Sequence, residues 1–429
     1  MGQTTVARVM GGLLVVASAV SASAQTGYQY EQLAPDPVLK TPATLESMSM
    51  RAAYEQRHRD CLDAGFHLDA VLAARPDWAG ALELRLFCER QENRRIDEMA
   101  DLNGLVELQP ENWKRWFDRA TLHQKNLELK AAMEDLNEAI KLRWWEINLY
   151  AQRSRWEEDQ QDYASAFADA ETIHRLVPIW PACLKEMARL ALKAGRGEAD
   201  SARYLKLAEI GDPKPEDSPR NDDALSTDGM GSEELMLRAG YALRQRKQEQ
   251  ELRFLNAALV RQPGLMLALE MRVQIAKYAT MEQRMNSRLF QTMNPRKDVD
   301  TLIALDPKRP DYYRLRIELR STRPYSYSET PEATLQDYGM IILLEPYEGR
   351  NYVDRADLRS QMKHPDFDAA IEDYRRAIDL EPSNAGYCYK MAQAYARNNA
   401  QLTEALALNW ALIGEPDNAA WLKERAKLP

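Results

Sequence analysis

The chain has 429 residues, of which 45% are hydrophobic and 29% are charged, and its formal net charge is −9. This composition is typical of a folded, soluble protein and excludes a mainly disordered one. The acidic balance, with no concentrated basic stripe, argues against a nucleic-acid-binding protein or one held on anionic lipid, because both need clustered Lys and Arg.

Residues 1–24 have the pattern of a secretory signal peptide. Arg8 supplies a positive charge, residues 11–20 form a short apolar run, and Ala22-Ser23-Ala24 precedes Gln25. We expect export by general secretion with cleavage after Ala24, and retention as an uncleaved anchor is the alternative. No later apolar stretch approaches the length needed to cross a bilayer, so we expect no membrane span in the mature chain.

A helix-stopping proline recurs along the chain at a nearly constant interval. Equal steps lead from Pro76 to Pro110, then to Trp144, and then to Pro178. From Pro263 on, three steps are longer than this period because of insertions, and the step from Pro382 to Pro416 equals it. A fixed period in this range indicates an array of repeated structural units rather than a single globular core.

Small and aromatic residues keep fixed distances before each stop, as in Ala370, Tyr374, Ala377 and Pro382. This pattern resembles the second helix of the tetratricopeptide repeat, and the resemblance covers roughly residues 45–418. It implies an all-α fold, an α-solenoid of about ten helix-turn-helix repeats, in which neighbouring helix pairs bury each other's apolar faces. It also implies a function in binding protein partners.

Other residues show where the resemblance holds and where it departs. Trp116 matches the tryptophan of the family's first helix. Glu98, Glu251 and Glu404 stand where the family pattern has a small residue before the aromatic one.

Two charged residues keep a fixed place in the repeat. With the stopping Pro numbered 32 and insertions set aside, position 7 is usually Arg and position 23 is usually Asp. The units starting at Pro181 and Ala385 lack both, which indicates ion pairing between first and second helices, because a lone charge in a partly buried seam is costly. A charged binding stripe is the alternative. The predicted pairs are Arg85–Asp101, Arg119–Asp135, Arg153–Asp169, Arg272–Asp298, Arg316–Asp337 and Arg355–Asp373.

The chain divides into a leader, two blocks of repeats and a cap. A run rich in Pro, Gly and acidic residues separates the blocks, as expected of a linker. A terminal repeat needs a capping element on its outer face. The predicted segments are a flexible leader over residues 25–44, five repeats over 45–212, a linker over 213–231, five repeats over 232–418, and a capping helix over 419–429.

Three repeats of the second block are longer than the basic period. Their extra residues fall between first and second helices, along one edge, around Lys277–Pro295, Ser321–Pro331 and His364–Asp366. Insertions on one face often mark a binding edge. Surface loops also tolerate length changes at little cost, so both interpretations stay open.

The resemblance implies a concave surface formed by the first helices, where family members bind their partners. The lysine and asparagine set by which some members clamp a C-terminal carboxylate is not assembled here. The matching positions in this sequence are Lys114, Phe117, Thr121, Asn148, Arg155, Tyr389 and Gln393.

No catalytic or metal-binding motif is found in the sequence. The five histidines are scattered, with no i, i+4 pair and no neighbouring Cys, and no phosphate-binding loop or nucleophile elbow is present. We therefore expect no metal, no cofactor and no enzymatic activity. We expect the cysteines to be buried free thiols, and a disulfide between Cys61 and Cys88, the only plausible pair, is the alternative.

We expect an exported scaffold, periplasmic or secreted, that binds a protein or peptide along its groove or its insert-bearing edge. Two other functions stay open. The Trp-rich first block offers flat apolar faces that suit a glycan or an envelope polymer. An enzyme site at the linker would need converging polar residues near Asp217–Asp228, which the sequence does not show.

Overall fold

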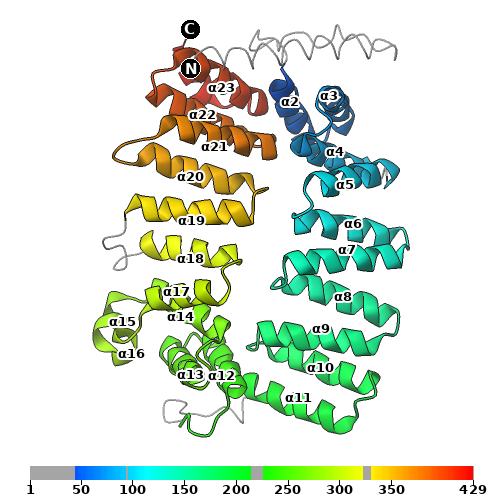
Figure 1. Ribbon diagram of the computed structural model, residues 1–429, viewed down its shortest axis with the longest axis vertical. Coiled ribbons are helices and arrows are strands. Elements are labelled where there is room, and N and C mark those ends of the chain that lie inside the picture. Colours follow the sequence, from blue (N-terminus) through cyan, green and yellow to red (C-terminus); the bar gives the residue numbers. More distant parts are fainter. Residues whose placement is uncertain (1–43, 93–94, 214–225, 322–329, 429) are drawn as a thin grey trace. The chain divides into compact units, whose positions relative to one another are not determined.

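The computed structural model describes residues 44–92, 95–213, 226–321 and 330–428, and in these ranges the chain forms helices and no strand (Figure 1). The predicted all-α repeat fold is confirmed. The predicted signal peptide, nearly all of the leader and most of the linker lie outside the described residues.

Within the described ranges, ten first helices alternate in chain order with ten second helices, two short insert helices lie within the seventh pair, and the short helix α24 (Ala419–Arg425) follows. The successive pairs are α2 (Leu45–Arg57) and α3 (Cys61–Ala74), α4 (Ala79–Glu92) and α5 (Arg95–Leu108), α6 (Trp113–Lys125) and α7 (Leu129–Leu142), α8 (Ile147–Asp159) and α9 (Tyr163–Leu176), α10 (Pro181–Lys193) and α11 (Glu198–Gly211), α12 (Ser232–Arg244) and α13 (Gln248–Arg261), α14 (Met266–Tyr278) and α17 (Pro295–Leu305), α18 (Pro310–Ser321) and α19 (Pro331–Leu344), α20 (Gly349–Gln361) and α21 (Phe367–Leu380), and α22 (Ala385–Arg397) and α23 (Gln401–Gly414).

The turn inside a repeat uses a left-handed residue at position 15. Its φ lies between 56° and 71° in six repeats, and the next N–H closes the first helix, as where Asp162 donates to the Glu157 carbonyl at 2.8 Å. This is the usual way to end a helix, although glycine is the usual residue. The six residues are Arg59, Leu127, Gln161, Gly195, Arg246 and Asn399.

The Arg at position 7 and the Asp at position 23 form two-pronged ion pairs in four repeats. Arg153 donates from Nε and Nη2 to both carboxylate oxygens of Asp169, at 2.9 and 2.6 Å, and Asp169 is only 3% exposed. The other three pairs are Arg85–Asp101, Arg272–Asp298 and Arg355–Asp373. The pairs Arg119–Asp135 and Arg316–Asp337 join residues of different compact units, described below, and stay predictions.

The same arginine also reaches back to the preceding repeat. Nη1 of Arg153 donates to Asn137 Oδ1 at 2.7 Å, sixteen residues earlier and on the preceding second helix. One guanidinium therefore joins three helices and fixes the register between neighbouring repeats. Equivalent bonds are Arg85–Asp69, Arg119–Asn103, Arg272–Asn256 and Arg316–Asp300, and in α24 Arg425–Asn409.

The chain forms two compact units, one made of residues 1–132 and 331–429 and the other of residues 133–330. We call them the terminal unit and the central unit. This division follows contacts in space, whereas the predicted blocks follow the sequence period, and the block boundaries stay predictions.

In the terminal unit, helices from the two ends of the chain pack together (Figure 1). Helix α2 contacts α23, and α4 contacts α21. Arg57 donates to the Ser383 carbonyl at 3.0 Å, and Trp78 Nε1 donates to the Asp379 carbonyl at 2.7 Å. Met50, which is fully buried, belongs to the core of the last repeats. The last repeat is thus covered by α2 as well as by α24.

In the central unit, the insert around Lys277–Pro295 forms two short helices, α15 (Met281–Asn286) and α16 (Arg288–Gln291). Phe290 enters the core at 6% exposure, and Ser287 Oγ donates to Glu249 on α13 at 2.6 Å. This insert is therefore anchored on α13. Most of the Ser321–Pro331 insert lies outside the described residues.

Gly80 lies at a close contact between the two ends of the chain, where helix α4 packs against α21. A Cβ there would fall 2.6 Å from the Asp379 carbonyl oxygen and 2.6 Å from Pro382 Cδ. We expect Gly80→Ala to lower the free energy of unfolding in urea by about 1–3 kcal/mol, because the added methyl group forces α4 away from the backbone around Asp379. Gly65→Ala is the control: no atom lies within 4 Å of its Cβ, so it should stabilise helix α3 by about 0.5–1 kcal/mol. Equal effects of the two variants would contradict the close contact.

The Arg153–Asp169 pair can be measured by a double-mutant cycle in the same assay. We expect Asp169→Ala to cost about 1–3 kcal/mol and the added Arg153→Ala to cost little more, because the pair acts as one unit. The more exposed pair Arg189–Glu186 should couple by less than about 0.5 kcal/mol. Additive losses at Arg153 and Asp169 would show that the pair carries no stability of its own.

Candidate functional site

A hollow of about 800 Å³ opens between helices α12, α13, α14 and α18 of the central unit. A second hollow of about 470 Å³ adjoins it and shares Leu267, Glu270 and Arg309. The lining of the larger one combines apolar and charged side chains, as expected of a binding site. Its residues are Leu243, Arg246, Gln248, Glu251, Leu267, Glu270, Met271, Gln274, Ile275, Tyr278, Arg309, Asp311, Tyr312, Arg314, Leu315 and Glu318.

The lining residues occupy recurrent places on the first helices. In α14, Leu267, Glu270 and Gln274 stand at positions 2, 5 and 9 of the repeat, and in α18 the same positions carry Asp311, Arg314 and Glu318. These spacings place the side chains on one helix face. The residues predicted to bind a partner in other repeats stand at the same positions, so the repeat period also marks these lining residues.

A polar cluster lies where the two hollows adjoin. Tyr312 donates its hydroxyl hydrogen to Glu270 at 2.9 Å, and Arg309 approaches the same carboxylate at 3.1 Å. Arg309 also lies over the rings of Tyr312 and Trp145, at 4.8 and 5.9 Å from their centroids. Burial raises the pKa of Glu270 although Arg309 opposes the shift. The cluster fixes one wall of the hollow through charge-assisted bonds.

Glu251 differs from the other acidic residues of the hollow. It is 3% exposed, and no hydrogen bond or ion pair joins its carboxylate to any residue that the structure describes. Burial alone raises its pKa to about 7. An uncompensated carboxylate in such a place favours the protonated form or a bound cation.

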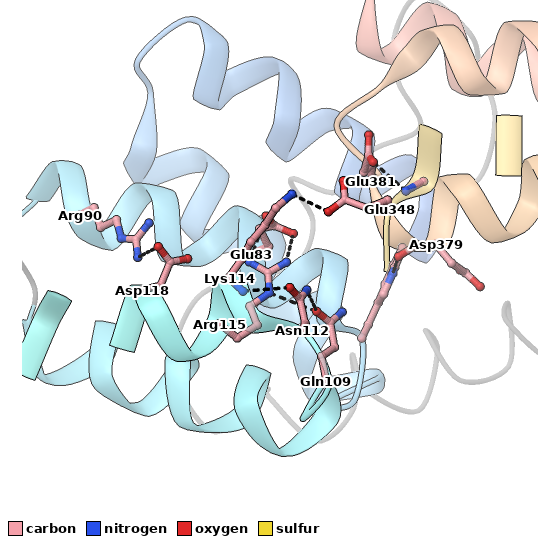
Figure 2. A network of polar contacts seen from close by, with 12 residues as sticks. Glu83, Arg90, Gln109, Asn112, Lys114, Arg115, Asp118, Glu348, Asp379 and Glu381 are labelled. Atoms are coloured by element: carbon pink, nitrogen blue, oxygen red, sulfur yellow. Dashed lines mark hydrogen bonds and ion pairs between the residues drawn. The ribbon is translucent and has the colours of Figure 1, made fainter. Parts of the chain in front are cut away.

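The predicted partner-binding residues fall on both units. Lys114 is tied to Glu348 at 2.5 Å, and Thr121 donates its hydroxyl hydrogen to the Phe117 carbonyl at 2.9 Å. Figure 2 shows Lys114 in a polar network of the terminal unit that also holds Arg115, buried and paired with Glu83. The Lys114 ammonium therefore bonds within the chain.

The other predicted residues differ in their surroundings. Tyr389 is half-buried and stacks on Trp421 of α24, with ring centroids 4.8 Å apart. Gln393, Asn148 and Arg155 are at least partly exposed. None of the seven predicted residues lines the two hollows, and their role in partner binding stays a prediction.

Among the described residues, no group of three or more His, Cys, Asp and Glu side chains is placed to hold a metal ion. Cys61 and Cys88 are free thiols, with Cys88 hydrogen-bonded to Cys61, and burial raises the pKa of Cys88. In the same parts of the chain, no helix is both long and apolar enough to span a bilayer.

Comparison with known proteins gives one match to a repeat family and several similar solved structures. Residues 366–399 match the family model of the TPR repeat. The crystal structure of the MamA protein is similar at 16% identity and a TM-score of 0.33, over 38% of this chain and 91% of that chain. The crystal structure of yeast Tom70 is similar at 13% identity and a TM-score of 0.28, over 89% of this chain and 93% of that chain. A tetratricopeptide repeat protein from Parabacteroides merdae is similar at 16% identity and a TM-score of 0.27, over 65% of this chain and 97% of that chain. Scores this low carry no argument about function. No curated protein sequence matches the chain.

Glu251 should make the stability of the chain depend on pH. Its folded-state pKa of about 7 lies above the ordinary value of 4.5, so between these pH values the folded chain holds a proton that the unfolded chain releases. Its contribution to stability therefore falls as pH rises through this window. We expect Glu251→Gln to be more stable than wild type by about 1–2 kcal/mol near pH 8. This is less than the free energy that corresponds to the whole pKa difference, because the hollow is open to water. Below about pH 4.5 the variant and wild type should be equally stable.

The measurement is urea unfolding at both pH values. Glu282→Gln, on the exposed face of α15, makes the same change of charge outside the hollow. The difference between the two variants isolates the effect of burial. If both variants change stability equally with pH, the carboxylate of Glu251 is compensated in solution.

Proposed function

We propose that this protein, a chain of tetratricopeptide repeats, is an exported scaffold that binds an extended segment of a partner protein in the hollow of the central unit. Repeats of this kind are typical of protein–protein interaction, and proteins built from them are usually not enzymes. The observation that carries the proposal is the hollow of about 800 Å³ lined by successive first helices.

The lining suits a peptide segment. Leu267, Met271, Ile275 and Leu315 offer apolar surface, and the charged residues around them supply hydrogen-bonding groups for orientation. The helices are held in register by the arginine bonds described above. Binding to a preformed surface requires little ordering of the scaffold, which favours affinity.

Export is proposed from the first residues of the chain. The support is the single positive charge of Arg8, the apolar run over residues 11–20 and the small residues Ala22 and Ala24 before Gln25. Such a segment is typical of secretory signals. The proposed location is the periplasm or the exterior of the cell.

A glycan as the ligand has less support. The proposal needs flat aromatic faces open to solvent. Trp78 and Trp156 are buried, and among the described residues only Trp144 and Trp180 are exposed, at 36% and 45%. An enzyme site at the linker falls mostly outside the described residues.

Photocrosslinking in the native envelope tests the proposed function. A photoreactive amino acid at Tyr278, 71% exposed and in the lining of the hollow, should give reproducible protein adducts by mass spectrometry. The same group at Val260, 74% exposed and outside the lining, is the control. Equal labelling from both positions, or no protein adduct at all, would overturn the proposal. If no protein adduct forms, the next measurement is the quenching of Trp fluorescence by soluble glycans.

A further inference from the structure

We propose that the hollow of the central unit selects partner segments that place a lysine or arginine side chain against Glu251, with apolar residues beside it. This inference rests on the proposed function and names the chemistry that the partner must supply.

The first argument is the balance of charge in the hollow. Each other acidic side chain of the lining has a basic neighbour: Glu270 has Arg309, Asp311 has Arg314 at 3.3 Å, and Glu318 has Lys277. Glu251 forms no ion pair with any described residue, although the exposed Arg246 also lines the hollow, and burial is the one influence on its pKa. The hollow therefore offers one uncompensated carboxylate to an incoming group.

The second argument comes from the repeat itself. Glu98, Glu251 and Glu404 stand at the same register position, where the family pattern has a small residue. Glu98 is buried but accepts a bond from Arg90 at 2.8 Å. Glu404 is only partly buried. Glu251 alone of the three is buried and unpaired, so burial at this position does not by itself explain the absence of a partner.

The third argument is the shape and polarity of the surroundings. Leu243, Leu267 and Met271 line the hollow with Glu251. Lysine and arginine have long apolar stems that pack along such surface while the charged end reaches a carboxylate. A buried carboxylate that gains a cationic donor forms one of the stronger hydrogen bonds found in proteins. A metal ion would need further acidic or histidine ligands, which the described residues do not gather here.

The test is selection of displayed random dodecapeptides with blocked ends on the full chain, compared with the Glu251→Gln and Glu282→Gln variants. We expect peptides selected on wild type and on Glu282→Gln to be enriched in a single Lys or Arg flanked by apolar residues. On Glu251→Gln this enrichment should disappear. A second measurement does not depend on any variant: in the best peptide, norleucine replaces the selected lysine, or citrulline the arginine. We expect the peptide with the neutral replacement to bind the wild-type chain about tenfold more weakly than the selected peptide does, as measured by fluorescence anisotropy.

The outcomes separate this inference from the proposed function. Peptides that bind equally well to wild type and Glu251→Gln, or that lose no affinity with the neutral replacement, would overturn the role of Glu251 and leave peptide binding in place. Enrichment of amide or hydroxyl side chains instead of Lys and Arg would also overturn it. Selection of no peptide on wild type would overturn both proposals.

Discussion

Each helix pair of this chain has an apolar face that it cannot bury by itself, and the need to cover that face governs the rest of the structure. Neighbouring repeats supply the cover along the array. At the last repeat two further elements supply it: α24 lays Trp421 on Tyr389, and α2 brings Met50 into the same core. Polar bonds set the register of this stacking. An arginine that must reach both its own second helix and the preceding one is satisfied at only one spacing between repeats, as Arg153 is by Asp169 and Asn137.

These demands leave few places free for recognition. Positions 7, 23 and 25 of the repeat are used by the arginine bonds, and the small residues of the second helices are used by helix packing. Positions 2, 5 and 9 of the first helices are the places that the resemblance to the repeat family implies for binding. In the terminal unit, Lys114 and Tyr389 at these positions bond or stack within the chain. In the central unit, Leu267, Glu270 and Gln274 at the same positions line a hollow.

The sequence predicted the features that a recurring residue type marks and missed those that no such residue marks. The regular spacing of the stopping prolines and the paired Arg and Asp led to the helix pairs and their ion pairs, because each feature recurs at a fixed interval. The contact of Trp78 with Asp379 joins residues about three hundred positions apart and occurs once, so no periodic signal marks it. The left-handed turns were missed because Leu127 and Gln161 stand where glycine would have identified them. The hollow was not predicted, because the predicted site residues stand at positions 2, 5 and 9 of other repeats.

A buried carboxylate without a counter-charge, such as that of Glu251, is costly in a single-core protein, where every element depends on the same packing. In a repeat array the cost is largely confined, because most contacts of a repeat are with its neighbours and stability is close to a sum over repeats and their interfaces. Here the neighbouring repeat is held by Arg272 with Asp298 and Asn256, and the insert helices add Phe290 to the adjoining core. The central unit can therefore hold one uncompensated carboxylate within a framework that many bonds keep in register. The architecture that makes each repeat dependent on its neighbours thus also limits how far a local functional cost spreads.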